Sequence, residues 1–120
     1  MQSDDISGLV QSELRRLIDP HRRASLESLL TPFQKLSLAW DYGREGERFE
    51  CWRVGQSPAG DILLVFCTQG FGPAFPWGFV FPGSQSLGMD SRWHSGLEDA
   101  AICSGLLDAP SGYEVPGPRE

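Results

Sequence analysis

The residue types best suited to nucleophilic chemistry are few in this chain. It has two histidines, His21 and His94, and three cysteines, Cys51, Cys67 and Cys103. A nucleophilic site needs a cysteine or serine beside a base that a third group orients. On one helix, the nine positions from His94 to Cys103 place the two side chains on opposed sides, and the chain has no GxSxG elbow. We therefore expect no nucleophilic site, and His94 at the surface.

Acidic residues crowd two places without forming an obvious acid–base pair. Glu45, Glu47 and Glu50 fall on one predicted hairpin, and Glu98 with Asp99 on the last predicted helix. Acid–base catalysis needs two carboxyls in a cleft with separated pKa values. These acids flank exposed turns, so we interpret them as solvated faces.

The sequence predicts no metal and no cofactor. No HxH, HExxH, CxxC or EF-hand pattern occurs, and Asp90 with His94 would supply only two ligands. Gly70-Phe71-Gly72 resembles part of a dinucleotide fingerprint, but the third glycine is missing. Cys51 and Cys67 could face each other across neighbouring strands; in a reducing cytosol we expect buried thiols there rather than a disulfide.

Aromatic residues are the most informative set. Phe71, Phe75, Trp77 and Trp93, together with Trp40 and Tyr42, exceed the needs of a small sheet and three helices. Protein-binding surfaces concentrate large aromatic side chains. We expect most of these rings in the core, with the loop pair Phe71 and Phe75 having the weakest claim to it.

The net charge of −6 lies entirely in residues 36–120, which hold eleven acids and five bases against five of each in residues 1–35. This sign disfavours nucleic-acid binding. It favours attraction to a basic protein, although solubility explains an acidic domain equally well. The longest apolar run is six residues and no secretory signal opens the chain, so we expect a bacterial-type cytoplasmic protein with no membrane span.

Two helices are predicted first. Apolar residues at i, i+3 and i+4 spacing indicate a helix from about Asp4 to Ile18. Asp19-Pro20 is typical of the N-cap and first position of a second helix, which we expect to end at Thr31-Pro32. Leu26, Leu29 and Leu30 would form its buried face.

Four strands should follow as a mainly antiparallel sheet. Alternation predicts strands at 36–42 and 48–55, and unbroken apolar runs predict strands at 62–68 and 77–81. In the second strand Phe49 and Cys51 fall on one face and Trp52 and Val54 on the other, which indicates two covered faces or a bulge. The stretch from Ile62 to Pro82 should be the centre of the sheet.

A last helix, capped by Asp90 or Ser95, should pack on the sheet with Trp93 and Leu97 near one face. The fold class is therefore α+β. We expect one domain over residues 1–108 and a flexible tail over residues 109–120, which is rich in proline and glycine.

Three segments between Trp40 and Ala100 carry a resemblance: WDYGREGERFECW, QGFGPAFPWGF and LGMDSRWHSGLEDA. In general character the chain is similar to the immunity proteins of bacterial polymorphic and contact-dependent toxin systems. The resemblance implies an acidic α+β domain that neutralises a cognate toxin, often a basic nuclease, by covering it. It carries no motif from which site residues can be transferred.

The leading hypothesis is a non-enzymatic protein-binding domain of this immunity type. Four acids, Asp41, Glu45, Glu47 and Glu50, would steer a basic partner, and Phe71, Phe75 and Trp77 would fill its surface. One alternative is a small enzyme or ligand-binding domain, with a pocket near the Gly70–Pro76 loop that holds His94, Asp90 and Cys67. Another is a homodimeric accessory or assembly protein that pairs through its aromatic face.

Overall fold

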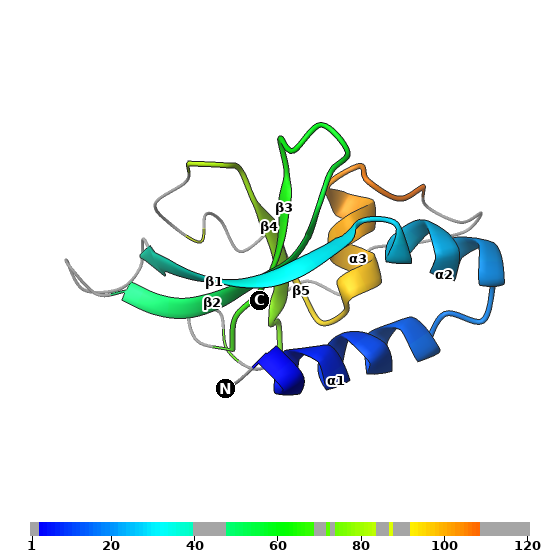
Figure 1. Ribbon diagram of the computed structural model, residues 1–120, viewed down its shortest axis with the longest axis horizontal. Helices are drawn as coiled ribbons and strands as arrows, with labels where there is room; N and C mark the ends of the chain where they lie inside the picture. Colours follow the sequence, from blue (N-terminus) through cyan, green and yellow to red (C-terminus); the bar gives the residue numbers. More distant parts are fainter. Residues whose placement is uncertain are drawn as a thin grey trace.

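The computed structural model describes residues 3–39, 48–68, 72, 74–83, 87 and 92–108. Within these ranges the chain forms three helices and a five-stranded antiparallel sheet in the order β1-β2-β3-β4-β5 (Figure 1). The predicted α+β class, with a C-terminal helix packed on the sheet, is confirmed. The elements are α1 Ser3–Arg15, α2 Pro20–Glu27, β1 Leu30–Ala39, β2 Arg48–Gln56, β3 Leu63–Phe66, β4 Trp77–Val80, β5 Trp93–His94 and α3 Leu97–Cys103.

Helix α1 ends earlier than its apolar stripe suggests. The backbone N–H groups of Arg16 and Leu17 donate to carbonyls three residues back, which tightens the last turn. Ile18 then lies outside the helix and is 93% exposed, so its predicted place on the buried stripe is wrong. The predicted cap of α2 is confirmed: Asp19 accepts from the His21 N–H at 2.8 Å, with Pro20 at the first position.

Helix α2 is shorter than predicted because β1 already begins at Leu30. Pro32, expected to stop the helix, instead lies inside this strand. An edge strand tolerates proline, since one side needs no N–H donor, and the pairing with β2 shifts register between Leu30 and Gln34. Sequence periodicity alone does not distinguish a proline that ends a helix from one at such a shift.

The centre of the sheet is β3, as predicted. Phe66 pairs with Trp52 of β2 and with Trp77 of β4, and Trp77 pairs with His94 of β5. Directly opposed residues share a face. This row therefore faces the helices, while Val65 and Cys67 face the other way.

Each face of the sheet has its own core. The helix-side core joins side chains of α1, α2 and α3 to the inner rows of β2, β3 and β4. The second core fills the opposite face, and its buried members are Leu38, Cys51, Val65, Cys67, Val80, Leu87 and Trp93. As predicted, Cys51 and Trp52 lie in different cores, and the pairing of β2 with β3 shifts register between Arg53 and Gly55.

Leu87 and Trp93 complete the second core. The Leu87 N–H donates to the Ala39 carbonyl at 2.8 Å, and the Trp93 indole Nε1–H donates to the Leu87 carbonyl at 2.8 Å. The Trp93 ring lies directly over Gly78, because a Cβ built there would be 2.4 Å from the ring. Leu87 and Trp93 are thus held on this face by hydrogen bonds and close ring packing.

The fifth strand corrects the predicted last helix. Trp93 and His94 pair with Gly78 and Trp77, and α3 begins only at Leu97. His94 is 2% exposed rather than at the surface, because strand pairing places it on the helix-covered face.

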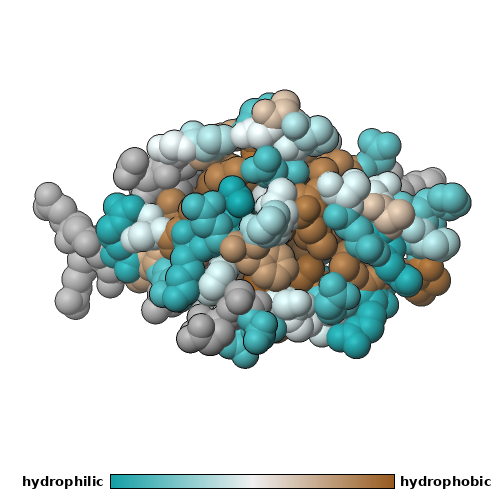
Figure 2. All heavy atoms as spheres, in the orientation of Figure 1, coloured by the Kyte–Doolittle hydropathy of each residue, from teal (hydrophilic) through white to brown (hydrophobic). Residues whose placement is uncertain are grey.

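Figure 2 shows apolar residues gathered across the middle of the visible face, with polar residues on both sides. Across the described ranges, no helix has the length and apolar character needed to cross a membrane.

Substituting Gly78→Ala tests the contact with Trp93. The added methyl would overlap the indole ring, so we expect the free energy of unfolding to fall by about 1–3 kcal/mol. Gly8→Ala in α1 is the matched control: its Cβ meets nothing within 4 Å, and helix propensity should raise stability by up to about 1 kcal/mol. Urea denaturation measures both changes, and equal stability of the two variants would contradict this packing.

Candidate functional site

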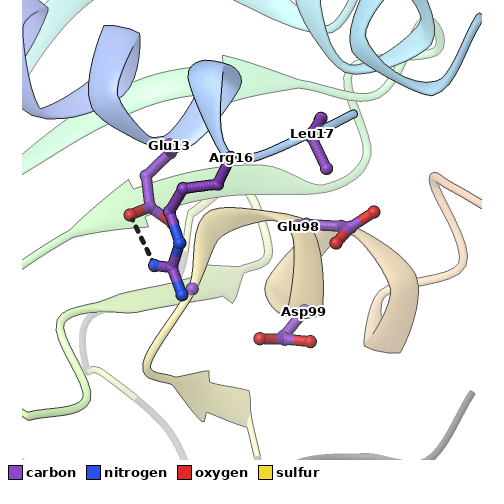
Figure 3. A pocket seen from close by; sticks show the side chains of 6 residues that line it. Glu13, Arg16, Leu17, Glu98 and Asp99 are labelled. Carbon is purple, nitrogen blue, oxygen red and sulfur yellow. Dashed lines mark hydrogen bonds and ion pairs between the residues drawn. The ribbon is translucent and has the colours of Figure 1, made fainter. Parts of the chain in front are cut away.

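A small acidic hollow of about 150 Å³ lies between α1 and α3 (Figure 3). Its walls come from the end of α1 and the start of α3, which are far apart in sequence but adjacent in space. The lining residues are Glu13, Arg16, Leu17, Gly96, Glu98 and Asp99.

Glu13 acts as a helix cap from a distance. Its Oε1 accepts the Leu97 N–H at 2.8 Å, and its Oε2 lies 3.2 Å from Nη1 of Arg16. The N-cap residue of α3, Gly96, has no side chain to satisfy the first turn. The carboxylate of α1 supplies that acceptor in place of the predicted Ser95 or Asp90, the latter of which lies outside the described residues.

The remaining polar groups near the hollow also hold helices together. Arg22 of α2 places Nη2 2.9 Å and Nε 3.0 Å from Oε2 of Glu98. Its Nη1 donates to the Asp108 carbonyl at 2.7 Å. A Cβ on Gly96 would lie 2.9 Å from Oδ2 of Asp99, so little room is left above the helix start. We interpret this hollow as a joint between three helices.

A larger, shallow groove of about 290 Å³ runs along the β1–β2 hairpin. Its lining residues are Lys35, Leu36, Ser37, Arg48, Phe49 and Glu50. In Figure 1 this half of the hairpin extends to the left, away from α2 and α3. Polar and apolar side chains alternate along both strands here, so Lys35, Ser37 and Glu50 share the face of Trp52, whereas Leu36 and Phe49 share the face of Cys51.

The apolar and the charged side chains of this hairpin lie on opposite faces. Leu36 and Phe49 are half-buried and pack against the second core. Lys35 and Glu50 are each 53% exposed, with Nζ and Oε2 3.9 Å apart. The Lys35 ammonium also lies 5.5 Å from the centre of the Trp52 ring. Ion pairs this exposed contribute little to stability, so these charges remain usable for binding.

The outer edge of β1 is closed by side chains. Arg48 donates to the Ser37 hydroxyl at 2.9 Å and also to the Ser37 carbonyl. Arg53 donates to the Pro32 carbonyl at 3.2 Å, and the Leu87 N–H occupies that of Ala39. Natural proteins block edge strands in this way against pairing with another strand. The hairpin therefore offers side chains, rather than open backbone, to a partner.

The predicted binding residues have different fates. Glu50 is exposed in the hairpin groove. Phe75 is half-buried and packs on the second core. Trp77 was predicted to meet a partner, and this is wrong: it is 3% exposed, with its ring centre 4.7 Å from that of Phe66. Asp41, Glu45, Glu47 and Phe71 lie outside the described residues.

The pocket expected to hold Cys67 and His94 is not formed by these two residues. Cys67 follows Phe66 and faces the second core, whereas His94 pairs with Trp77 and faces the helices. Their side chains are thus on opposite faces of the sheet. Asp90 lies outside the described residues. In the part of the chain that the structure describes, no three His, Cys, Asp or Glu residues are grouped to bind a metal.

The two buried cysteines behave as predicted. Both Cys51 and Cys67 are thiols, 0% and 1% exposed. The hydrogen bond between the thiols, followed by burial, raises the pKa of Cys51 far above that of an ordinary thiol. Cys51 is therefore protonated in the folded protein, which does not suit it to act as a nucleophile.

Sequence reasoning missed Lys35, Leu36 and Phe49 as parts of a site. Their alternation predicted the strands, but only the pairing of β1 with β2 shows that they lie side by side at one end of the hairpin. Comparison with known proteins found no family model, curated protein or solved structure that matches this chain. The site is therefore interpreted from its own geometry.

Replacing Glu13 with alanine tests the long-range cap. The Leu97 N–H would lose its acceptor, and we expect the free energy of unfolding to fall by about 1–2 kcal/mol. Glu27→Ala is the control, because Glu27 is an exposed helical glutamate at the end of α2 and should change stability by less than about 0.5 kcal/mol. Urea denaturation should separate the two; indistinguishable midpoints would show that Glu13 is not the cap.

Proposed function

We propose that this chain is a non-enzymatic protein-binding domain, of the immunity type, that neutralises a basic toxin by covering it. The observation that supports this most is the groove on the projecting β1–β2 hairpin. The exposed charges of Lys35 and Glu50 lie on one face of the hairpin, and the half-buried Leu36 and Phe49 lie on the other. Protein–protein interfaces use both charged and apolar side chains.

The charge of the hairpin suits a basic partner. Residues 40–50 contain four acids, Asp41, Glu45, Glu47 and Glu50, against two arginines. Acidic groups on a projecting element attract a cationic partner and raise its association rate. This supports the steering role proposed for these acids, of which Glu50 is an exposed, described residue.

The apolar part of the proposed interface differs from the one that the sequence suggested. With Trp77 in the core, the half-buried apolar residues of this end of the hairpin are Leu36 and Phe49, which lie on the opposite face from Glu50. Leu38 and Cys51, their cross-strand partners on the same face, are buried and fix the hairpin on the second core. A surface fixed in this way loses little conformational entropy when a partner binds.

An exposed ring supports a second candidate, a homodimeric accessory protein. Phe81 is 45% exposed and packs edge-on against Phe79, with their ring centres 6.4 Å apart. The Arg92 guanidinium lies 4.9 Å from the centre of the Phe81 ring. Size-exclusion chromatography with light scattering distinguishes the candidates: a dimer that Phe81→Ser dissociates would favour self-association.

Charge reversal tests the proposed interface. We expect Glu50→Lys to slow association with a partner purified from the native host by about threefold to tenfold at low salt. Glu27→Lys changes charge equally on α2, away from the hairpin, and should leave the rate nearly unchanged. Surface plasmon resonance at two salt concentrations measures both.

Two results would contradict the proposal. Equal slowing by the two variants would indicate a general charge effect. An unchanged rate for Glu50→Lys, with circular dichroism showing a folded protein, would place the partner elsewhere. Leu36→Ser then tests the apolar wall, and it should mainly raise the dissociation rate.

A further inference from the structure

Two thiols meet where β2 pairs with β3. Trp52 is opposite Phe66, so the next pair along the antiparallel ladder is Cys51 with Cys67. The Cys67 N–H donates to the Pro76 carbonyl at 2.8 Å, on the β4 side. Because N–H groups alternate in direction along a strand, that of Phe66 points to β2. Cys51 and Cys67 therefore form a non-hydrogen-bonded pair, the type with closer side chains.

This type of pair matches the reach of a disulfide. Its Cα atoms are about 4.5 Å apart, and disulfides span Cα separations of about 4.4–6.8 Å. The Cys51 Sγ donates to the Phe49 carbonyl at 3.5 Å. The Cys67 Sγ also lies 3.7 Å from the Glu50 carbonyl, on the residue next to Cys51. The two sulfur atoms can therefore bond without a change in the backbone of either strand.

The second core separates Cys51 and Cys67 from the third cysteine, Cys103, and from solvent. Both thiols lie within the second core, among Leu38, Val65 and Val80. Cys103, on α3, is exposed and belongs to neither core. Burial keeps an oxidant away from the folded pair, so reaction requires that β2 and β3 separate or that the chain is folding.

We propose that Cys51 and Cys67 are a latent cross-strand disulfide, which a small disulfide such as oxidised glutathione closes as the chain folds. One thiolate attacks oxidised glutathione, forming a mixed disulfide and releasing one reduced glutathione. The second thiolate attacks the protein sulfur of that mixed disulfide and releases another. Two cysteines are oxidised, one glutathione disulfide is reduced, and both thiol protons end on glutathione.

The Cys51–Cys67 disulfide would link β2 covalently to β3 near the register shift in their pairing, between Arg53 and Gly55. It also closes a loop of about 17 residues, which restricts the unfolded chain. The oxidised protein should therefore unfold at a melting temperature about 10 °C higher than the reduced protein. This inference stands independently of the proposed partner.

The test uses the full chain carrying Cys103→Ser, so that only the pair can react. The protein is unfolded, then refolded in a glutathione redox buffer or under reducing conditions. We expect the oxidised product to lose about 2 Da and both titratable thiols. It should keep the circular dichroism of the reduced protein and show the higher melting temperature. Cys51→Ser in the same background cannot close and should show neither the mass loss nor the shift.

Three results would overturn the inference. Both thiols could remain after refolding, or glutathione could stay attached as a mixed disulfide. The linked chain could instead melt below the reduced protein, which would mean that the bond distorts the sheet. Cys67→Ser, in the Cys103→Ser background, gives a second single-thiol control if Cys51→Ser fails to fold.

Discussion

Burial of β3 on both faces is the constraint from which the rest of the structure follows. Leu64 and Phe66 point into the helix-side core, and Val65 points into the second core. A strand covered on both sides needs two separate apolar layers. The chain supplies one layer with three helices and the other with a second set of buried side chains, which includes Leu87 and Trp93 of β5. Loss of either layer would expose half of the central strand to water.

The same constraint decides which surface remains for function. The helices cover one face of the central strands, while the far half of the β1–β2 hairpin extends beyond them (Figure 1). Its backbone edge is closed by Arg48 and Arg53, so the exposed features are charged side chains and the partly covered Leu36 and Phe49. Binding through such a surface requires no movement of the core, in keeping with a protein that acts by covering its partner.

The sequence predicted the parts of the fold that depend on local pattern. The apolar run at 62–68 became β3, and Asp19-Pro20 began a helix because a side-chain acceptor and a fixed φ act within two residues. Prediction from the sequence was wrong where the conformation of a segment depends on residues far away in the chain. Pro32 lies in a strand because β1 is at an edge, and Trp93 lies in a strand because Gly78 leaves room for its ring. The cap of α3 comes from Glu13, 84 residues earlier, which no local pattern reveals.

The candidate site was predicted only in part, for the same reason. Glu50 could be placed on an exposed hairpin from its neighbours. Trp77 could not be placed, because a tryptophan in a short aromatic strand suits a core or an interface equally well. Its pairing with Phe66 and His94 decides in favour of the core. The groove combines residues from two strands, so it becomes visible only when their register is known.

Hydrogen–deuterium exchange of the chain, alone and bound to its purified partner, tests the central claim most directly. The account predicts that slowed exchange on binding concentrates in peptides covering Lys35–Ala39 and Arg48–Glu50, with little change in α1 and α2. Slowed exchange confined to the helices, with the hairpin unchanged, would contradict it.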